Sequence, residues 1–175
     1  MKAILAVLLL ASPLLAQNGP ADTPAAPGCG APEASFEVKT ERAGTAVAQP
    51  DMGKALVYFV EDDSQFGSIP KPTTRAGVDG RWVGATHGNS YLFISVDPGE
   101  HHLCASWQSA VIVGQGHKTV AAHFTAAAGG VYYFAVKNTW VRDLGTAGIS
   151  LTPLDSDEGQ LLLRTFLLST SHQKK

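Results

Sequence analysis

Residues of the kinds that bind metal ions are concentrated between Glu100 and Cys104 (EHHLC). Carboxylate, imidazole and thiolate groups are the usual ligands of zinc. Side chains on a β-strand alternate between its faces, so Glu100, His102 and Cys104 would share one face while His101 points to the other. His123 would join them only if its own strand lies alongside. The alternative is a polar strand end after a tight turn. We adopt that alternative and expect no metal site and no cofactor.

Complete catalytic motifs are missing from the sequence. It contains no G-x-S-x-G nucleophile elbow, no H-E-x-x-H helix and no G-x-x-x-x-G-K-[ST] phosphate loop. Asp155, Asp157 and Glu158 are acidic, but their spacing does not match a complete calcium loop. Nothing beside Cys104 marks it as an activated thiolate. We therefore expect a protein that is not an enzyme, and we assign no catalytic residue.

Aromatic residues offer a second kind of site. Trp82, Trp107 and Trp140 would suit an aromatic face that binds a sugar or a peptide, but aromatic residues in strands usually pack in the core. Trp82 is the best surface candidate because it directly follows the turn sequence Asp79-Gly80. With Tyr91, it forms the candidate ligand surface for a glycan or peptidoglycan.

Residues 1–16 have the layout of a cleavable signal peptide. Lys2 precedes an apolar run from Ala3 to Leu10, and small Ala16 marks the expected cut. The run is shorter than the ~20 residues of a membrane-spanning helix, so we expect no transmembrane segment after cleavage. Residues 17–34 are rich in Pro, Ala and Gly, which predicts a flexible leader. The expected location is the periplasm or the extracellular medium.

The chain contains two cysteines, Cys29 and Cys104. Export would bring them to an oxidising compartment, where an even count favours a disulfide over two free thiols. The bridge would clip the leader onto the strand that carries Cys104. It would close a loop of about 75 residues, worth about 3–5 kcal/mol in the chain-entropy model.

The charges of the chain are close to balance, with 13 Lys and Arg against 15 Asp and Glu. No basic run appears, so nucleic acid is not an expected partner. The partners that we expect are an envelope protein or a glycan.

Short strands with frequent turn signals fill the chain from Gly53 to Leu151. We expect Asp79-Gly80 to close a hairpin. We also expect Asp97-Pro98-Gly99 to turn the chain so that the next strand returns antiparallel. The strands are predicted at Lys54–Glu61, Arg75–Gly84 (with the hairpin), Tyr91–Val96, Glu100–Gln108, Thr119–Thr125, Val131–Lys137 and Thr146–Thr152.

This pattern predicts an all-β fold over residues 35–170. It would be a single antiparallel β-sandwich of about seven or eight strands, in the manner of Ig-like modules. Asp155 and Glu158 have the spacing of a capping box, which predicts a short C-terminal helix laid on the sandwich. The polar end of the chain predicts a frayed segment from Ser169, with residues 171–175 as a tail.

Several motifs together resemble a known family. They are GKALVYF (Gly53–Phe59), VDGRWVG (Val78–Gly84), NSYLFISVDPGEHHLCASWQS (Asn89–Ser109) and AAAGGVYYF (Ala126–Phe134). This combination resembles an exported bacterial domain of unknown function, and part of it is similar to PEGA-type surface β-sandwich modules. The resemblance implies export and a β-sandwich, PEGA-like in the part that is similar to those modules. It implies no reaction, cofactor or catalytic residue.

The function expected from the sequence is that of a non-catalytic module of the cell envelope or a secreted module, which binds another macromolecule or stabilises an assembly. One alternative is a glycan- or peptidoglycan-binding module that uses Trp82 and Tyr91. Another is a metal-binding protein or enzyme centred on Glu100, His102 and His123.

Overall fold

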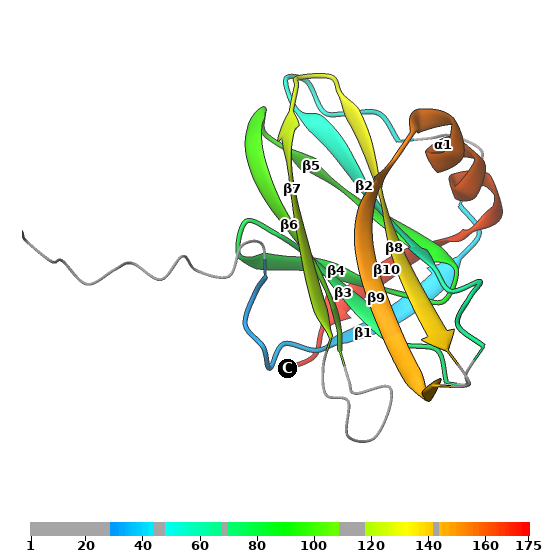
Figure 1. Ribbon diagram of the computed structural model, residues 1–175. Coiled ribbons are helices and arrows are strands. Elements are labelled where there is room, and N and C mark those ends of the chain that lie inside the picture. Colours follow the sequence, from blue (N-terminus) through cyan, green and yellow to red (C-terminus); the bar gives the residue numbers. More distant parts are fainter. Residues whose placement is uncertain (1–28, 44–47, 68–69, 109–117, 142–143) are drawn as a thin grey trace, which may run out of the picture.

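A computed structural model describes residues 29–43, 48–67, 70–108, 118–141 and 144–175. The expected signal peptide, 1–16, and most of the expected leader lie outside these residues. Ten strands and one helix make up the regular structure of the described residues (Figure 1). They are β1 (Phe36–Glu41), β2 (Ala55–Asp62), β3 (Thr73–Val78), β4 (Arg81–His87), β5 (Ser90–Val96), β6 (Gly99–Trp107), β7 (Thr119–Ala126), β8 (Val131–Val141), β9 (Thr146–Leu154), α1 (Ser156–Thr165) and β10 (Leu167–Gln173).

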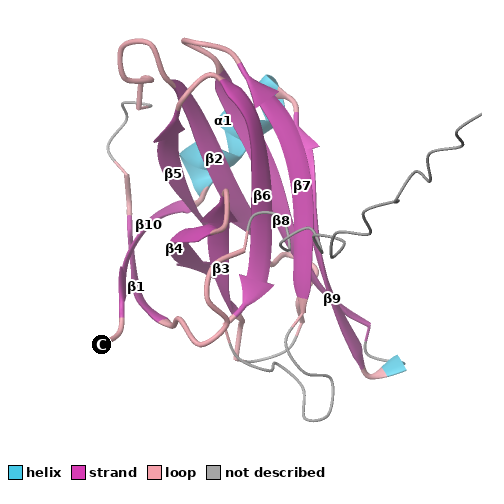
Figure 2. Ribbon diagram, turned by 90° about the vertical axis from the view of Figure 1, so that its left-hand side faces the viewer, coloured by secondary structure: helices cyan, strands magenta, loops and turns pink. Residues whose placement is uncertain are grey.

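The strands form two sheets that pack face to face (Figure 2). The larger sheet has the order β1-β10-β5-β2-β8-β9, and the smaller has the order β4-β3-β6-β7. Most neighbours are antiparallel, but β2 pairs with β8 and β10 pairs with β5 in parallel. The predicted all-β fold is therefore confirmed. The two packed, mostly antiparallel sheets agree with the predicted antiparallel sandwich of about seven or eight strands. The details differ, because β1 and β10 bring the described strands to ten and two of the strand pairs are parallel.

Strand β2 lies in the middle of the larger sheet and is apolar on both faces, as its sequence predicts. Ala55, Val57 and Phe59 pack against the smaller sheet and form the centre of the main core. The residues between them on β2 face the other way, towards α1. The side chains of β2 from Ala55 to Glu61 are buried, because the strand is covered on both sides. This explains the continuous apolar run from Ala55 to Val60.

Helix α1 begins at Ser156, where the sequence predicts it. The N-cap residue Asp155 accepts hydrogen bonds through Oδ1 from the backbone N–H groups of Asp157 and Glu158, both at 2.9 Å. The helix lies on the outer face of the larger sheet rather than over an edge (Figure 1). Gly159 permits this close packing, because a Cβ atom there would overlap the ring of Tyr133.

The end of the chain forms strand β10, Leu167–Gln173. The prediction of a frayed segment from Ser169 and a tail from residue 171 is therefore wrong for the residues of this strand. This strand fits between β1 and β5. Its hydroxyl groups make specific contacts: Ser169 Oγ donates to Ser90 Oγ at 2.8 Å, and Ser171 Oγ accepts from the N–H of Ala85 at 2.9 Å. A polar strand is stable here because backbone pairing and side-chain hydrogen bonds replace its contacts with water.

The turn at Asp97-Pro98-Gly99 has a different role from the one predicted. Strands β5 and β6 do not pair with each other, because β5 belongs to the larger sheet and β6 to the smaller one. The chain therefore crosses between the sheets at this turn, where Gly99 has a φ of 137°.

The Asp79-Gly80 hairpin is confirmed, with positive φ values of 49° and 78° at its two central residues.

Candidate functional site

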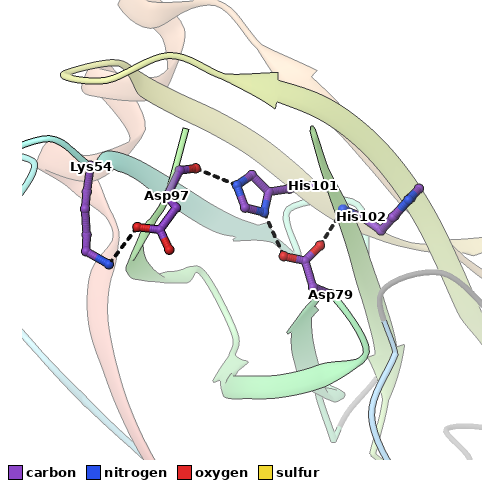
Figure 3. A network of polar contacts seen from close by, with 5 residues as sticks. All are labelled: Lys54, Asp79, Asp97, His101 and His102. Carbon is purple, nitrogen blue, oxygen red and sulfur yellow. Dashed lines mark hydrogen bonds and ion pairs between the residues drawn. The ribbon is translucent and has the colours of Figure 1, made fainter. Parts of the chain in front are cut away.

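The first polar cluster is the turn network, which consists of Lys54, Asp79, Asp97 and His101 (Figure 3). Asp79 Oδ2 lies 2.7 Å from His101 Nδ1, and Asp97 O lies 2.6 Å from His101 Nε2. Both ring nitrogens thus face acceptors, which requires the doubly protonated imidazolium. Lys54 Nζ reaches Asp97 Oδ1 at 3.1 Å. The network holds the β3–β4 hairpin, the β5–β6 turn and the start of β6 together.

The opposite charges of Asp79 and His101 determine the protonation states of these two residues in the turn network. Burial alone would lower the pKa of His101, but the Asp97 carbonyl and the Asp79 carboxylate outweigh it and raise the pKa above 6.5. Burial would raise the pKa of Asp79. Hydrogen bonds from the His102 N–H, at 2.9 Å, and from His101 reverse this and lower the pKa below 3.8. Both groups are therefore held in their charged forms.

The second polar cluster, the carboxyl pair, consists of Glu61 and Asp63 with their shared donor Asn138. Glu61 and Asn138 are fully buried, and Asp63 is 2% exposed. Asn138 Nδ2 donates to Glu61 Oε1 and to Asp63 Oδ1, each at 2.7 Å, and Thr74 Oγ1 donates to Glu61 Oε1 at 2.6 Å. Asn138 Oδ1 accepts from Trp107 Nε1 at 2.8 Å. Residues of both sheets thus meet in one buried hydrogen-bonded cluster.

The surroundings of the carboxyl pair favour the protonated, neutral forms of Glu61 and Asp63. Burial raises the pKa of Glu61 well above 4.5, and the neighbouring charge of Asp63 raises it further. Burial also raises the pKa of Asp63 above 3.8. Glu61 Oε2 and Asp63 Oδ2 are buried without a hydrogen-bond partner among the described residues. Two such carboxyls ionise together at high cost, so the pair retains a proton to higher pH than exposed acids do.

The third cluster, the N-terminal clamp, ties residues 29–34 to the smaller sheet. Arg75 Nη1 donates to the carbonyls of Pro32 and Ala34 at 2.8 and 2.7 Å. The guanidinium carbon of Arg75 lies 4.5 Å from the ring centre of Trp82, a cation–π contact. Trp82 Nε1 donates to the carbonyl of Ala31 at 2.7 Å. The predicted flexible leader is therefore wrong for residues 29–34, because these contacts and a buried Ala34 fix them on the domain.

The predicted disulfide between Cys29 and Cys104 is confirmed, with a Cα–Cα distance of 5.2 Å. Cys104 is fully buried on β6, and the bridge spans 75 residues of sequence. The clamp and the disulfide thus fasten the same segment, one through hydrogen bonds and stacking and the other through a covalent bond.

The candidate metal residues lie near one another but do not form a site. His102 is the cross-strand neighbour of His123, and Glu100 lies opposite Thr125. Cys104 belongs to the disulfide and cannot ligate as a thiolate. Within the described residues, no three His, Cys, Asp or Glu side chains come together as they would around a metal ion.

The candidate ligand surface of Trp82 and Tyr91 is not present. Tyr91 is 6% exposed and packs with Tyr58 beneath α1, at a ring-centre distance of 6.0 Å. Trp82 is half-buried in the clamp. Trp107 is fully buried, as the packing interpretation of the tryptophans expects, and it lies in a cluster with Trp140.

A pocket of about 220 Å³ lies elsewhere, beside β7, β8 and β9. Phe124, Tyr132 and Phe134 supply aromatic parts of its wall, and His123 also lines it. None of the residues of the turn network or of the carboxyl pair lines this pocket. The ionisable groups of these two clusters therefore do not face this pocket. Tyr133, whose pKa is raised above 10.0 by burial, does line it.

The carboxyl pair is the feature that sequence reasoning missed. Glu61 on β2 continues the alternating row of Ala55, Val57 and Phe59, and Asp63 follows directly after the strand with the same spacing. This period of two is the signal by which the sequence could have indicated the pair. The partner Asn138 is distant in sequence, and no local pattern connects it to them.

Among the described residues, no helix has the length and apolar character needed to cross a membrane. Comparison of the chain with known protein families, with curated proteins and with solved structures finds no match. The family resemblance of the motifs stays a prediction.

Proposed function

We propose that the protein is an exported, non-catalytic module of the cell envelope or a secreted module, and that it serves as a rigid scaffold that binds another macromolecule. The observation that carries this proposal is the disulfide between Cys29 and Cys104. Disulfides persist in oxidising compartments and are rare in reducing ones. A cysteine pair that joins an N-terminal segment to the middle of a sheet fits a domain built to work outside the cytoplasm.

The use of the polar residues supports a scaffold rather than an enzyme. The turn network joins a hairpin to β6, the carboxyl pair joins the two sheets, and Arg75 holds the N-terminal segment. A catalytic acid or base must reach a substrate, either directly or through one water molecule. Glu61, whose pKa is strongly raised, has no exposed surface.

We further infer that the fold is an Ig-like or PEGA-like β-sandwich. The face-to-face packing of two mostly antiparallel sheets supports this, and so do the motifs that resemble PEGA-type modules. The two parallel strand pairs are a departure from a purely antiparallel sandwich.

The two alternatives receive less support. A glycan-binding face of Trp82 and Tyr91 would need exposed rings, and Tyr91 is buried. A zinc site on Glu100, His102 and His123 would need a further ligand, and the disulfide occupies Cys104.

Intact-mass spectrometry of protein recovered from the periplasm or the medium, with and without reduction, tests the proposal. We expect a mass for residues 17–175 less two hydrogens, and thiols that react with an alkylating reagent only after reduction. Protein retained in the cytoplasm with two free thiols would contradict export. Turnover of a substrate that is lost in Glu61→Gln would contradict a non-catalytic role.

Removal of the disulfide gives a second test of the scaffold. Cys29→Ala is expected to lose about 2–5 kcal/mol of unfolding free energy, measured in urea without reductant. Wild-type protein in reductant is the matched control and should lose a similar amount. An unchanged denaturation midpoint in both would show that the bridge adds nothing to the fold.

A further inference from the structure

Strand β7 is the last strand of the smaller sheet, in the order β4-β3-β6-β7 (Figure 2). Strand β9 of the larger sheet lies near it but does not pair with it. The N–H of Trp107 donates to the carbonyl of Lys118 at 3.0 Å. In an antiparallel ladder, successive residues alternate between bonding the neighbouring strand and pointing away from it. The even-numbered residues of β7 therefore bond β6. The odd-numbered residues, from Thr119 to Thr125, direct their N–H and C=O groups out of the sheet.

The other three sheet edges carry features that oppose pairing with another chain. Strand β1 presents Glu37, Lys39 and Glu41, and β9 contains Pro153. Strand β4 lies against β10, where the N–H of Ala85 is already bonded to Ser171 Oγ.

Strand β7 lacks these protections. Its sequence, TVAAHFTA, contains no Lys, Arg, Asp, Glu or Pro. Its outward-directed residues, Thr119, Ala121, His123 and Thr125, all have exposed side chains, and their backbone groups have no partner among the described residues. The aromatic pocket opens beside the same edge, at Ala122 to Phe124. An uncharged edge of this length pairs readily with another strand.

We propose that β7 is the dimerisation edge of this protein and that its partner is β7 of a second copy, paired antiparallel. The sequence of the strand is self-complementary about Ala122. In this register Thr119 faces Thr125 of the second copy, and Ala121 faces His123. These are the residues whose backbone groups point outward, as hydrogen-bonded pairs require.

The side chains of this register also fit. On the inner face Val120 lies opposite Phe124 of the second copy, and on the outer face the two threonines meet. Pairs of β-branched residues with aromatic residues, and pairs of threonines, are favourable across strands. No charge opposes a like charge. The dimer would join the two four-stranded sheets into one continuous sheet and would cover the pocket beside the edge. It does not depend on the proposed function.

Two variants with charges on the edge test the register. Thr119→Lys with Thr125→Lys places like charges opposite each other at both ends of the paired strands. Thr119→Glu with Thr125→Lys places opposite charges there. Both variants lose the same hydrogen bond from Thr119 Oγ1 to Ser106 Oγ, at 2.9 Å, so they are matched controls for the monomer fold.

Sedimentation velocity over a concentration series is the measurement, on protein purified after its natural processing. Wild-type protein should change from monomer to dimer as its concentration rises. The Lys/Lys variant should dissociate at least about tenfold more readily than the Glu/Lys variant. Amide hydrogen exchange at Ala121, His123 and Thr125 should slow in the dimer.

A wild-type protein that stays monomeric at every concentration reached would overturn the proposal. So would a dimer that the two variants affect equally, because its interface would lie elsewhere. Slowed exchange at the same amides only after addition of an unrelated extended peptide would assign the edge to a different partner and would also overturn it.

Discussion

The turn network and the carboxyl pair lie at opposite ends of the same two strands. Lys54 precedes β2 and Asp79 follows β3, whereas Glu61 is near the end of β2 and Thr74 is near the start of β3. The turn network lies partly at the surface and joins unlike charges. The carboxyl pair is buried and brings together two groups that would carry like charges.

The difference shows how the position of a polar group decides its effect on the fold. Near water, Asp79 and His101 attract each other and both stay charged. In the interior, Glu61 and Asp63 are satisfied by Asn138 only in part, and a retained proton avoids two buried negative charges. The turn network stabilises the fold through the attraction between opposite charges. The carboxyl pair is compatible with the fold because it retains a proton.

The two clusters therefore respond differently to pH. The lowered pKa of Asp79 gives stability that is present above pH 3.8 and is lost as pH falls through its folded pKa. The raised pKa of His101 gives stability that is full below pH 6.5 and is lost as pH rises through its folded pKa. The raised pKa of Glu61 gives stability that is full below pH 4.5 and is lost as pH rises through its folded pKa.

Asn138→Asp should have the largest effect. It replaces the donor shared by Glu61 and Asp63 with a third carboxyl, so we expect a loss of about 3–5 kcal/mol in unfolding free energy at neutral pH. Urea denaturation measures it. Lys137→Gln, at the neighbouring position of β8, is the control and should change stability by less than about 0.5 kcal/mol. Equal denaturation midpoints for Asn138→Asp and wild type would contradict the buried cluster.

Asp79→Ala should have an intermediate effect on the turn network. It removes the acceptor of His101 and of the His102 N–H, and it places alanine at a φ of 49°. The expected loss is about 1–3 kcal/mol.

Asp79→Asn separates charge from shape at this position. Asparagine tolerates the same backbone conformation and still accepts from the His102 N–H, but it carries no charge. The pKa of His101, followed by NMR titration of its ring, should fall relative to wild type. An unchanged titration would show that Asp79 does not set the protonation of His101.

Lys54→Ala should have the smallest effect. The side chains of Lys54 and Asp97 are 41% and 79% exposed, so water and salt screen their ion pair. We expect a loss between about 0 and 1 kcal/mol in urea denaturation. A larger loss, removed by high salt, would show that the turn network depends on this pair more than its exposure indicates.

The sequence predicts the turn network better than the carboxyl pair, for physical reasons. Asp79-Gly80 and Asp97-Pro98-Gly99 are local turn signals, and strand alternation places His101 on the face opposite to His102. That face turns out to meet Asp79. Local patterns thus predict the two turns and the strand face on which His101 lies. They do not predict the contact between His101 and Asp79.

The carboxyl pair depends on contacts that no local pattern contains. Glu61 ends the apolar run of its strand, and the end of a strand is commonly solvent-exposed. Its hydrogen-bond partners are Thr74 and Asn138, and Asn138 accepts in turn from Trp107. All three lie on other strands and are distant in sequence. Strand β10 was missed for a similar reason, since polar LLSTSHQ becomes a strand only because β1 and β5 provide partners on both sides.

The pH dependence of unfolding free energy, compared between wild type and Glu61→Gln, tests the central claim most directly. Glutamine has nearly the same shape as a protonated glutamate but cannot ionise. If Glu61 is buried and neutral, the two proteins should keep a constant difference in unfolding free energy below pH 4.5. Above it, wild type should lose stability relative to Glu61→Gln as pH rises through the folded pKa of Glu61. Parallel curves over the whole range would contradict a buried carboxyl that retains its proton.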